Sequence, residues 1–253
     1  MTQQDLQGKI ALVTGGGVGI GAAIAESLAA RGARIVLTYN SHKPSSEALV
    51  RLRSSNDEEA LAFQIDLTLE HKVDEFGAIM EKELGRVDIL VHNAGGLVQR
   101  SRIEDMSYEL FRKVQAVNVD SVFLLSKRVL PLIPKEGRII VISSLAGQNG
   151  GHPGATAYAT SKAALFGFTR GLCKEVADRG ITVNSVAPGF IEATPFHDTF
   201  TTEDSKQKTI STIPLGRPGV PADVASAVLW LASPSASFIS GTVIDVNGAQ
   251  HFH

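Results

Sequence analysis

The chain has almost no cysteine, little net charge and no long apolar run. Its 253 residues include one cysteine, Cys173, so a disulfide within the chain is impossible and a reducing compartment is expected. The formal net charge is -2, which gives no electrostatic argument for a nucleic-acid partner. No apolar run approaches membrane-spanning length, and the first residues show no signal pattern. We therefore expect a soluble cytoplasmic protein whose partners are neither nucleic acid nor a membrane.

The sequence also lacks a nucleotide-binding motif, a hydrolase motif and a cluster of metal ligands. A nucleotide-binding Walker loop needs Lys and Ser/Thr after its last glycine, whereas Gly21 is followed by Ala22. Ser144 does not stand in a Gly-x-Ser-x-Gly elbow, which counts against a hydrolase. His251 and His253 are close together, but a pair at the terminus is more typical of a solvated or interface tail. We predict no metal site.

Strand-like and helix-like segments alternate along the chain, whose residues are 43% hydrophobic and 20% charged. Strands that are apolar throughout are typical of a parallel sheet covered on both faces. We predict one doubly wound α/β domain over residues 1–253, with a seven-stranded parallel sheet and helices on both faces. The longest irregular stretch is 189–220. The expected strands are Lys9–Val13, Arg34–Tyr39, Ala60–Ile65, Val87–Val91, Arg138–Ile142, Thr182–Val186 and Thr242–Val246, and the expected helices are Gly19–Arg31, Ser45–Ser54, Glu70–Leu84, Tyr108–Leu132, Ala157–Arg179 and Pro221–Leu231.

A glycine-rich stretch, TGGGVGIG, joins the first strand to the first helix at Thr14–Gly21. Glycine there serves a tight turn, or it lets backbone N–H groups approach a phosphate at the helix N-terminus. The run from Gly17 to Ala22 fits the G-x-G-x-x-G/A form of dinucleotide-binding folds. In such folds the ligand lies beyond the carboxyl ends of the strands. The position therefore favours a dinucleotide on a Rossmann-type domain.

A tyrosine and a lysine follow the fifth strand at helical spacing. Tyr158 and Lys162 are four residues apart, so they share one face of a helix. The phenol of tyrosine has a pKa near ~10, and a neighbouring cation lowers it. A serine hydroxyl at the strand end, Ser144, can share the oxygen of a carbonyl under reduction. The spacing is common by chance in surface pairs, but its setting in a dinucleotide fold favours catalysis.

These residues resemble the short-chain dehydrogenases/reductases over nearly the whole chain. The resemblance rests on the glycine motif, Asp66, Asn93-Ala94-Gly95, Pro188-Gly189 and a tetrad of Asn118, Ser144, Tyr158 and Lys162. It implies an NAD(P)-dependent enzyme that transfers a hydride between a nicotinamide and a carbonyl or secondary alcohol. It also implies a homotetramer or dimer. A cofactor-binding regulator that has lost catalysis is the alternative from another class, and the complete tetrad counts against it.

The resemblance assigns a role to each tetrad residue. Tyr158 is the general acid in reduction and the base in oxidation, and Ser144 polarises the carbonyl. Lys162 lowers the pKa of the tyrosine and binds the ribose next to the nicotinamide. Asn118 holds a water that relays protons to Lys162.

The expected cofactor is NADP(H), with NAD(H) also possible. No carboxylate follows the second strand to repel a 2′-phosphate, whereas Asn40, Ser41 and Lys43 can donate to it. Many NADP-dependent relatives carry a basic residue at the position of Val18. The expected cofactor contacts are Thr14, Gly15, Gly17, Val18, Gly19, Ile20, Tyr39, Asn40, Ser41, Asp66, Leu67, Asn93, Ala94, Gly95, Tyr158, Lys162, Pro188, Gly189, Ile191 and Thr194.

Two positions depart from the family pattern. A threonine usually stands four residues after the glycine of Pro188-Gly189 and contacts the carboxamide, but Ala193 stands there and Thr194 comes one later. Either the loop shifts by one residue or a backbone group takes over. His92 replaces a frequent second asparagine, which we expect to be a mild change.

Residues of three loops are expected to line the substrate pocket, with 189–220 as the substrate loop. Arg100, Gln148, His152 and His197 give a polar, basic lining, which predicts a small keto-sugar or a uronate-derived keto acid. The rival substrate is a 3-oxoacyl thioester, because the chain also resembles 3-oxoacyl-carrier-protein reductases. That rival places Phe196, Phe200 and Ile210 along an acyl chain.

Overall fold

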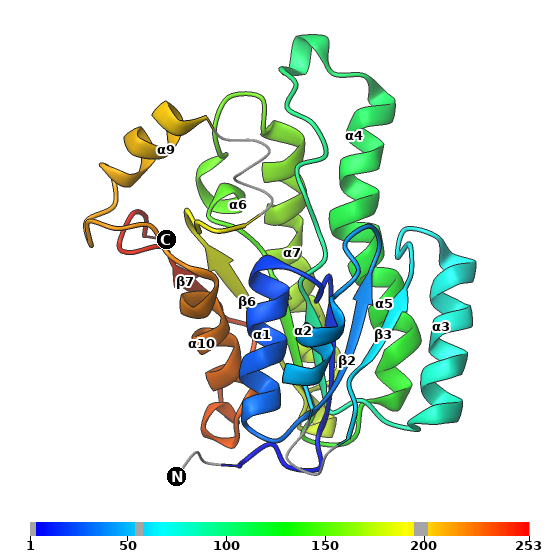
Figure 1. Cartoon of the computed structure of the whole chain (residues 1–253). Coiled ribbons are helices and arrows are strands. Elements are labelled where there is room, and N and C mark those ends of the chain that lie inside the picture. Colours follow the sequence, from blue (N-terminus) through cyan, green and yellow to red (C-terminus); the bar gives the residue numbers. More distant parts are fainter. Residues whose placement is uncertain (1–3, 54–57, 195–201, 253) are drawn as a thin grey trace.

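Seven parallel strands form the centre of the molecule in the computed structural model, which describes residues 4–53, 58–194 and 202–252 (Figure 1). Their spatial order is β3-β2-β1-β4-β5-β6-β7, so the predicted doubly wound sheet is confirmed. The strands are β1 (Ile10–Thr14), β2 (Arg34–Tyr39), β3 (Leu61–Gln64), β4 (Ile89–His92), β5 (Arg138–Ile142), β6 (Thr182–Pro188) and β7 (Val243–Val246).

Both faces of the sheet are buried, as the uninterrupted apolar runs predicted. In β1, Ala11 and Val13 belong to the core on one face, and Leu12 belongs to the core on the other. The second core includes Phe76 from α3 and Leu125 from α5, and none of these side chains is more than 2% exposed. Successive residues of a strand point to opposite faces, so a strand in such a sheet needs apolar residues throughout.

Helices cover the two faces as separate layers (Figure 1). Helices α1, α2 and α10 contribute to one core, and α3, α5 and α7 to the other. The helices are α1 (Gly19–Ala30), α2 (Ser46–Arg51), α3 (Glu70–Glu83), α4 (Tyr108–Gln115), α5 (Ser121–Val129), α6 (Ala146–Asn149), α7 (Thr156–Glu175), α9 (Glu203–Ile210) and α10 (Pro221–Ala232). Over the described ranges, none of them has the length and apolarity that crossing a bilayer requires.

The helices depart from the sequence prediction in several places, and α6 was not predicted at all. The predicted helix over 108–132 is divided by a π-helical turn at Ala116–Asp120, which contains Asn118. The stretch 189–220 is not wholly irregular, because it contains α9. Thr202 caps α9 by accepting a hydrogen bond from Ser205 N, and acidic residues occupy its first turn. This helix is polar, so it lacks the apolar periodicity by which helices are predicted from sequence.

The strand order reverses between β1 and β4. Chain connections leave β1 toward β2 and β3 on one side, and the later strands extend the sheet on the other. Helices on opposite faces therefore diverge at the carboxyl ends of β1 and β4, which leaves a crevice there. Gly15 and Asn93 stand at these two strand ends.

Candidate active site

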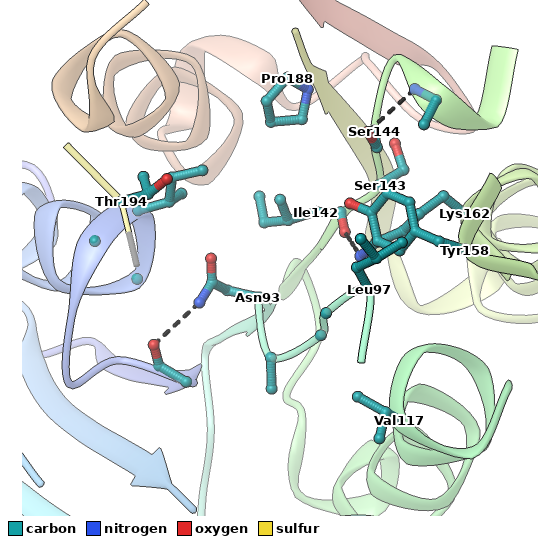
Figure 2. A pocket seen from close by; sticks show the side chains of 18 of the residues that line it. Asn93, Leu97, Val117, Ile142, Ser143, Ser144, Tyr158, Lys162, Pro188 and Thr194 are labelled. Atoms are coloured by element: carbon teal, nitrogen blue, oxygen red, sulfur yellow. Dashed lines mark hydrogen bonds between the residues drawn. The ribbon is translucent and has the colours of Figure 1, made fainter. Parts of the chain in front are cut away.

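A cavity of about 840 Å³ lies at the carboxyl ends of the strands. Its wall comes from the loops after β1, β2, β3, β4, β5 and β6, together with α7 and α9. Figure 2 shows Tyr158 and Lys162 reaching into it close to Ser143 and Ser144, with Asn93 and Thr194 on the other side. A cavity of this size takes a ligand larger than a small carbonyl compound.

The ends of β1 and β4 are tied together by Thr14 and Asn93. Thr14 Oγ1 accepts hydrogen bonds from the backbone N–H groups of Asn93 at 3.0 Å and Ala94 at 2.9 Å. Asn93 Nδ2 donates to Thr14 O at 2.9 Å and to Gly15 O at 3.1 Å. Thr14 is buried behind the wall, so it supports the glycine turn from behind.

The glycine turn leads into α1 with its N-terminal backbone uncapped. Val18 at the N-cap makes no side-chain capping bond, and the first turn of α1 carries no acidic residue. Its N–H groups and the helix dipole therefore suit an anion such as a pyrophosphate. Gly17, a predicted cofactor contact, lies outside the cavity lining, and a Cβ there would lie 2.2 Å from His42 O. It allows the loop after β2 to pack against the glycine turn.

The far end of the cavity is polar and lies between the loops after β2 and β3. Asp66 accepts hydrogen bonds through Oδ1 from Thr68 N at 2.9 Å and Thr68 Oγ1 at 2.6 Å, which fixes its loop. Ser41 Oγ lies 3.0 Å from His42 Nδ1. Lys43, named from the sequence as a phosphate donor, is exposed outside the lining. The side chains of this end are Tyr39, Asn40, Ser41, His42, Asp66, Leu67 and Thr68.

Ser144, Tyr158 and Lys162 lie together at the end of the cavity opposite the polar end, here named the reacting end (Figure 2). Tyr158 and Lys162 project from the same face of α7, as their spacing predicted. Lys162 Nζ donates to Ile142 O at 2.9 Å, and Ser144 Oγ accepts from Ala146 N at 3.1 Å. The hydroxyl groups of the serine and the tyrosine also share a hydrogen bond.

Asn118 lies behind this wall and is fully buried. Its Oδ1 accepts from Gly96 N at 3.0 Å, and its Nδ2 donates to Gly96 O at 2.8 Å and Val114 O at 2.9 Å. A Cβ on Gly95 would lie 2.6 Å from Asn118 Oδ1 and 3.0 Å from Lys162 Nζ, so only glycine leaves room for both. The side chain of Asn118 is thus used to join the loop after β4 to the π-helical turn.

Comparison with known proteins places this site in a family. The sequence model of a family described as Enoyl-(Acyl carrier protein) reductase matches residues 16–251. The 3-oxoacyl-[acyl-carrier-protein] reductase of Vibrio cholerae is 39% identical over 98% of this chain and 99% of its own. The reductase of the same name from Haemophilus influenzae is 40% identical over 97% of this chain and 99% of its own.

The chain belongs to the short-chain dehydrogenase/reductase family. A Brucella melitensis short-chain dehydrogenase/reductase, titled glucose/ribitol dehydrogenase, superposes with a TM-score of 0.91 at 31% identity, covering 99% of this chain and 100% of that one. A blue fluorescent protein from a metagenomic library, solved with NADPH, gives a TM-score of 0.87 at 34% identity, covering 98% and 100%. This short-chain dehydrogenase/reductase is therefore an NAD(P)-dependent oxidoreductase for the carbonyl/alcohol pair.

Burial dominates the electrostatics of Tyr158 and Lys162 in this oxidoreductase. It raises the pKa of Tyr158 to about 12, and the hydrogen bond with Ser144 opposes this only in part. Burial also lowers the pKa of Lys162 to about 8. The lowering of the tyrosine pKa by Lys162, expected from the sequence, does not prevail here. A phenol that keeps its proton at neutral pH suits the acid required for reduction.

The turn after β6 accounts for the departure at Ala193. Ala193 has a left-handed φ of +56° and is exposed, whereas Thr194 is only 6% exposed and lines the cavity. Thr194 Oγ1 donates to Ile191 O at 3.2 Å. Thr194 therefore reaches the cavity wall although it stands one position later in the sequence than the family pattern.

The structure separates the residues predicted to contact substrate. Arg100 and His152 line the cavity. Gln148 does not: its Nε2 donates to Asp245 Oδ1 at 2.8 Å and ties α6 to β7, because α6 turns that side chain toward the sheet edge. His197 lies outside the described residues, as do Phe196 and Phe200, and Ile210 lies beside the lining rather than in it.

Many lining residues escaped the sequence prediction, among them His42, Phe190, Thr209 and Gln250. His42 directly follows Ser41, a predicted cofactor contact, so its position next to that residue was the one sequence signal that could have predicted it. Phe190, Thr209 and Gln250 belong to no motif of the family pattern. Only folding brings α9 and the end of the chain to the cavity.

Proposed function

We propose that this enzyme reduces the ketone of a 3-oxoacyl thioester with NADPH. The observation that carries the proposal is the likeness, at 39% and 40% identity over nearly the full length, to relatives named 3-oxoacyl-[acyl-carrier-protein] reductase. Ser144, Tyr158 and Lys162 line the cavity, and Asn118 lies buried behind its wall. Much of the lining beside the reacting end is apolar, with Leu97, Val117, Leu145 and Phe190 offering contacts to an acyl chain.

The residues at the reacting end are arranged to protonate a carbonyl oxygen. Ser144 and Tyr158 both present hydroxyl groups to the same point of the cavity, so a ketone oxygen there accepts a hydrogen bond from each. Tyr158 then gives its proton to that oxygen as negative charge develops. When bound, the nicotinamide supplies the hydride. Lys162 would bind the ribose hydroxyls and return a proton to Tyr158. Asn118 would hold a water that relays protons to Lys162.

The preference for NADPH is proposed from the end of β2. A 2′-phosphate there would meet Asn40, Ser41 and His42, all of which line the cavity and none of which is negatively charged. The test compares kcat/KM for NADPH and NADH at a saturating concentration of acetoacetyl-CoA. A clear advantage for NADPH is expected, and an advantage for NADH would refute the assignment.

A second substrate class is favoured by Arg100 and His152. Both line the cavity with Asn149, and such a polar patch suits a keto-sugar or a uronate-derived keto acid. The experiment measures kcat/KM for 3-oxoacyl-CoA substrates of increasing chain length and for a uronate-derived 2-keto acid. Values that climb with chain length support the thioester. Turnover of the keto acid alone, with KM raised in Arg100→Ala, would reverse the choice.

We also propose that the enzyme is a homotetramer, as its family resemblance implies. Sedimentation velocity of the purified protein tests this directly. A single species with the mass of one chain would contradict it.

A further inference from the structure

The chain returns to the cavity after β7. Gln250 lines the cavity, and its backbone N–H donates to Asn247 O at 3.1 Å. Asn247 Nδ2 donates to His251 O at 3.0 Å, so residues 247–251 form a closed loop, here named the C-terminal segment. A Cβ on Gly189 would lie 2.8 Å from Asn247 Cβ. The C-terminal segment therefore packs directly on the Pro-Gly turn of the active site.

The same segment supports the chain that follows α9. Gln250 Nε2 donates to Thr212 Oγ1 at 2.8 Å, and Leu215 N donates to Gly248 O at 3.2 Å. A Cβ on Gly248 would lie 2.6 Å from Ile213 Cγ2. Two hydrogen bonds and a close packing contact thus fix residues 212–215 to the C-terminal segment.

The bond from Gln250 continues to a residue of the cavity wall. The hydroxyl of Thr212 donates its one proton to Thr209 O at 2.7 Å, so it must accept from the amide of Gln250. This fixes the amide orientation and places Gln250 Oε1 3.4 Å from the Cβ position of Gly189. Thr209 is 8% exposed and lines the cavity. Gln250, Thr212 and Thr209 are thus one relay from the C-terminal segment to the wall.

We propose that Gln250 is a positioning residue for the carbonyl substrate, which it serves by holding Thr212 and the cavity-facing end of α9. The relay lies beside β6 and β7, at the opposite end of the sheet from β2 and β3, whose loops form the polar end. Its loss therefore loosens the substrate wall and leaves the polar end of the cavity, where the 2′-phosphate would bind, unchanged.

Two variants test the relay. Gln250→Met keeps the length of the side chain and removes the amide, and Thr212→Val removes the hydroxyl. Each is expected to speed amide hydrogen exchange in the peptide 203–216 and to raise KM for acetoacetyl-CoA about fivefold, the worth of one hydrogen bond. The kcat stays within twofold. The double variant adds nothing further, because one interaction is broken in all three.

Gln207→Met is the matched control, since Gln207 lies on the exposed face of α9 and donates to Glu203 Oε1 at 3.0 Å. Gln207→Met should leave amide hydrogen exchange near residue 212 and the KM for acetoacetyl-CoA unchanged. Thr212→Ser, which keeps the hydroxyl that Thr212→Val removes, should give wild-type values of both. The KM readout rests on the proposed function, whereas hydrogen exchange needs no substrate. Failure of the wild type to reduce acetoacetyl-CoA overturns only the proposed substrate. Unchanged exchange in Gln250→Met, or additive effects in the double variant, overturns the relay.

Discussion

Lys162 Nζ lies 5.7 Å from the centre of the Tyr158 ring and gives its hydrogen bond to Ile142 O. The backbone of β5 therefore holds the ammonium group over the face of the Tyr158 ring. Since the carbonyl of a buried strand cannot move away, the lysine is oriented before any ligand arrives. This arrangement separates the roles of the two residues and makes each of them testable.

Tyr158→Phe removes only the hydroxyl and keeps the ring in the cavity wall. Because the proton for the carbonyl oxygen comes from that hydroxyl, kcat should fall by about 10²–10⁴. NADPH affinity, measured by the fluorescence of the bound nicotinamide, should stay within threefold. Turnover close to that of the wild type would show that another group supplies the proton.

Lys162 predicts opposite effects of alkaline pH on activity and on stability. Its pKa is about 8 in the folded chain, against 10.5 as the reference value. Between these values the unfolded chain binds more protons, so this group makes folding more favourable as pH rises through the window. Activity should fall above pH 8, because the cation is lost. Profiles of kcat/KM and of Tm from pH 6.5 to 9.5 check both.

Lys162→Met is the control for this prediction. It should lose the alkaline gain in Tm relative to the wild type, and it should lose both turnover and cofactor affinity. A wild-type kcat/KM that stays flat up to pH 9.5 would count against the assigned role of the cation.

His92 predicts sensitivity to acid. The side chain of His92 is buried, and its Nε2 lies 2.8 Å from Ser126 Oγ. Burial lowers the pKa of the imidazole from 6.5 to about 3. Between these values the unfolded chain takes up the proton and the folded chain does not. Folding stability should therefore decrease as pH falls from 6.5, by up to about 1.4 kcal/mol per pH unit.

His92→Asn should flatten this dependence in urea unfolding followed from pH 7 to 4. His71→Asn on the exposed surface of α3 is the matched control and should leave the slope unchanged. Equal slopes in the wild type and in His92→Asn would mean that other groups cause the acid effect.

Gly17→Ala tests the contact between the glycine turn and the loop after β2. The new Cβ would lie 2.2 Å from His42 O, a backbone atom, so one of the two loops must shift. We expect a loss of about 1–3 kcal/mol in unfolding free energy and weaker NADPH binding. Gly167→Ala in α7 meets nothing within 4 Å and should be neutral or stabilising by up to ~1 kcal/mol. Equal behaviour of both variants in urea unfolding and NADPH titration would contradict this reading.

Motif residues were predictable because local chemistry constrains them. The glycine turn must follow β1, and Tyr158 and Lys162 must share a helical face at a spacing of four. The predicted strands match the observed ones to within about two residues because burial on both faces leaves a continuous apolar signature. The polar α9 left no such signature, since its start is defined by a cap and charges rather than by burial.

The sequence by itself determined the parallel α/β order, and it predicted the place of the dinucleotide site and the residues that we propose for catalysis, because each depends on neighbours along the chain. Tertiary structure alone decided which side chains form the wall. It turned Gln148 to Asp245, brought Gln250 to Thr212, and put Thr194 in the lining. These outcomes depend on contacts between segments far apart in sequence, and such contacts form only when the sheet and its loops have packed.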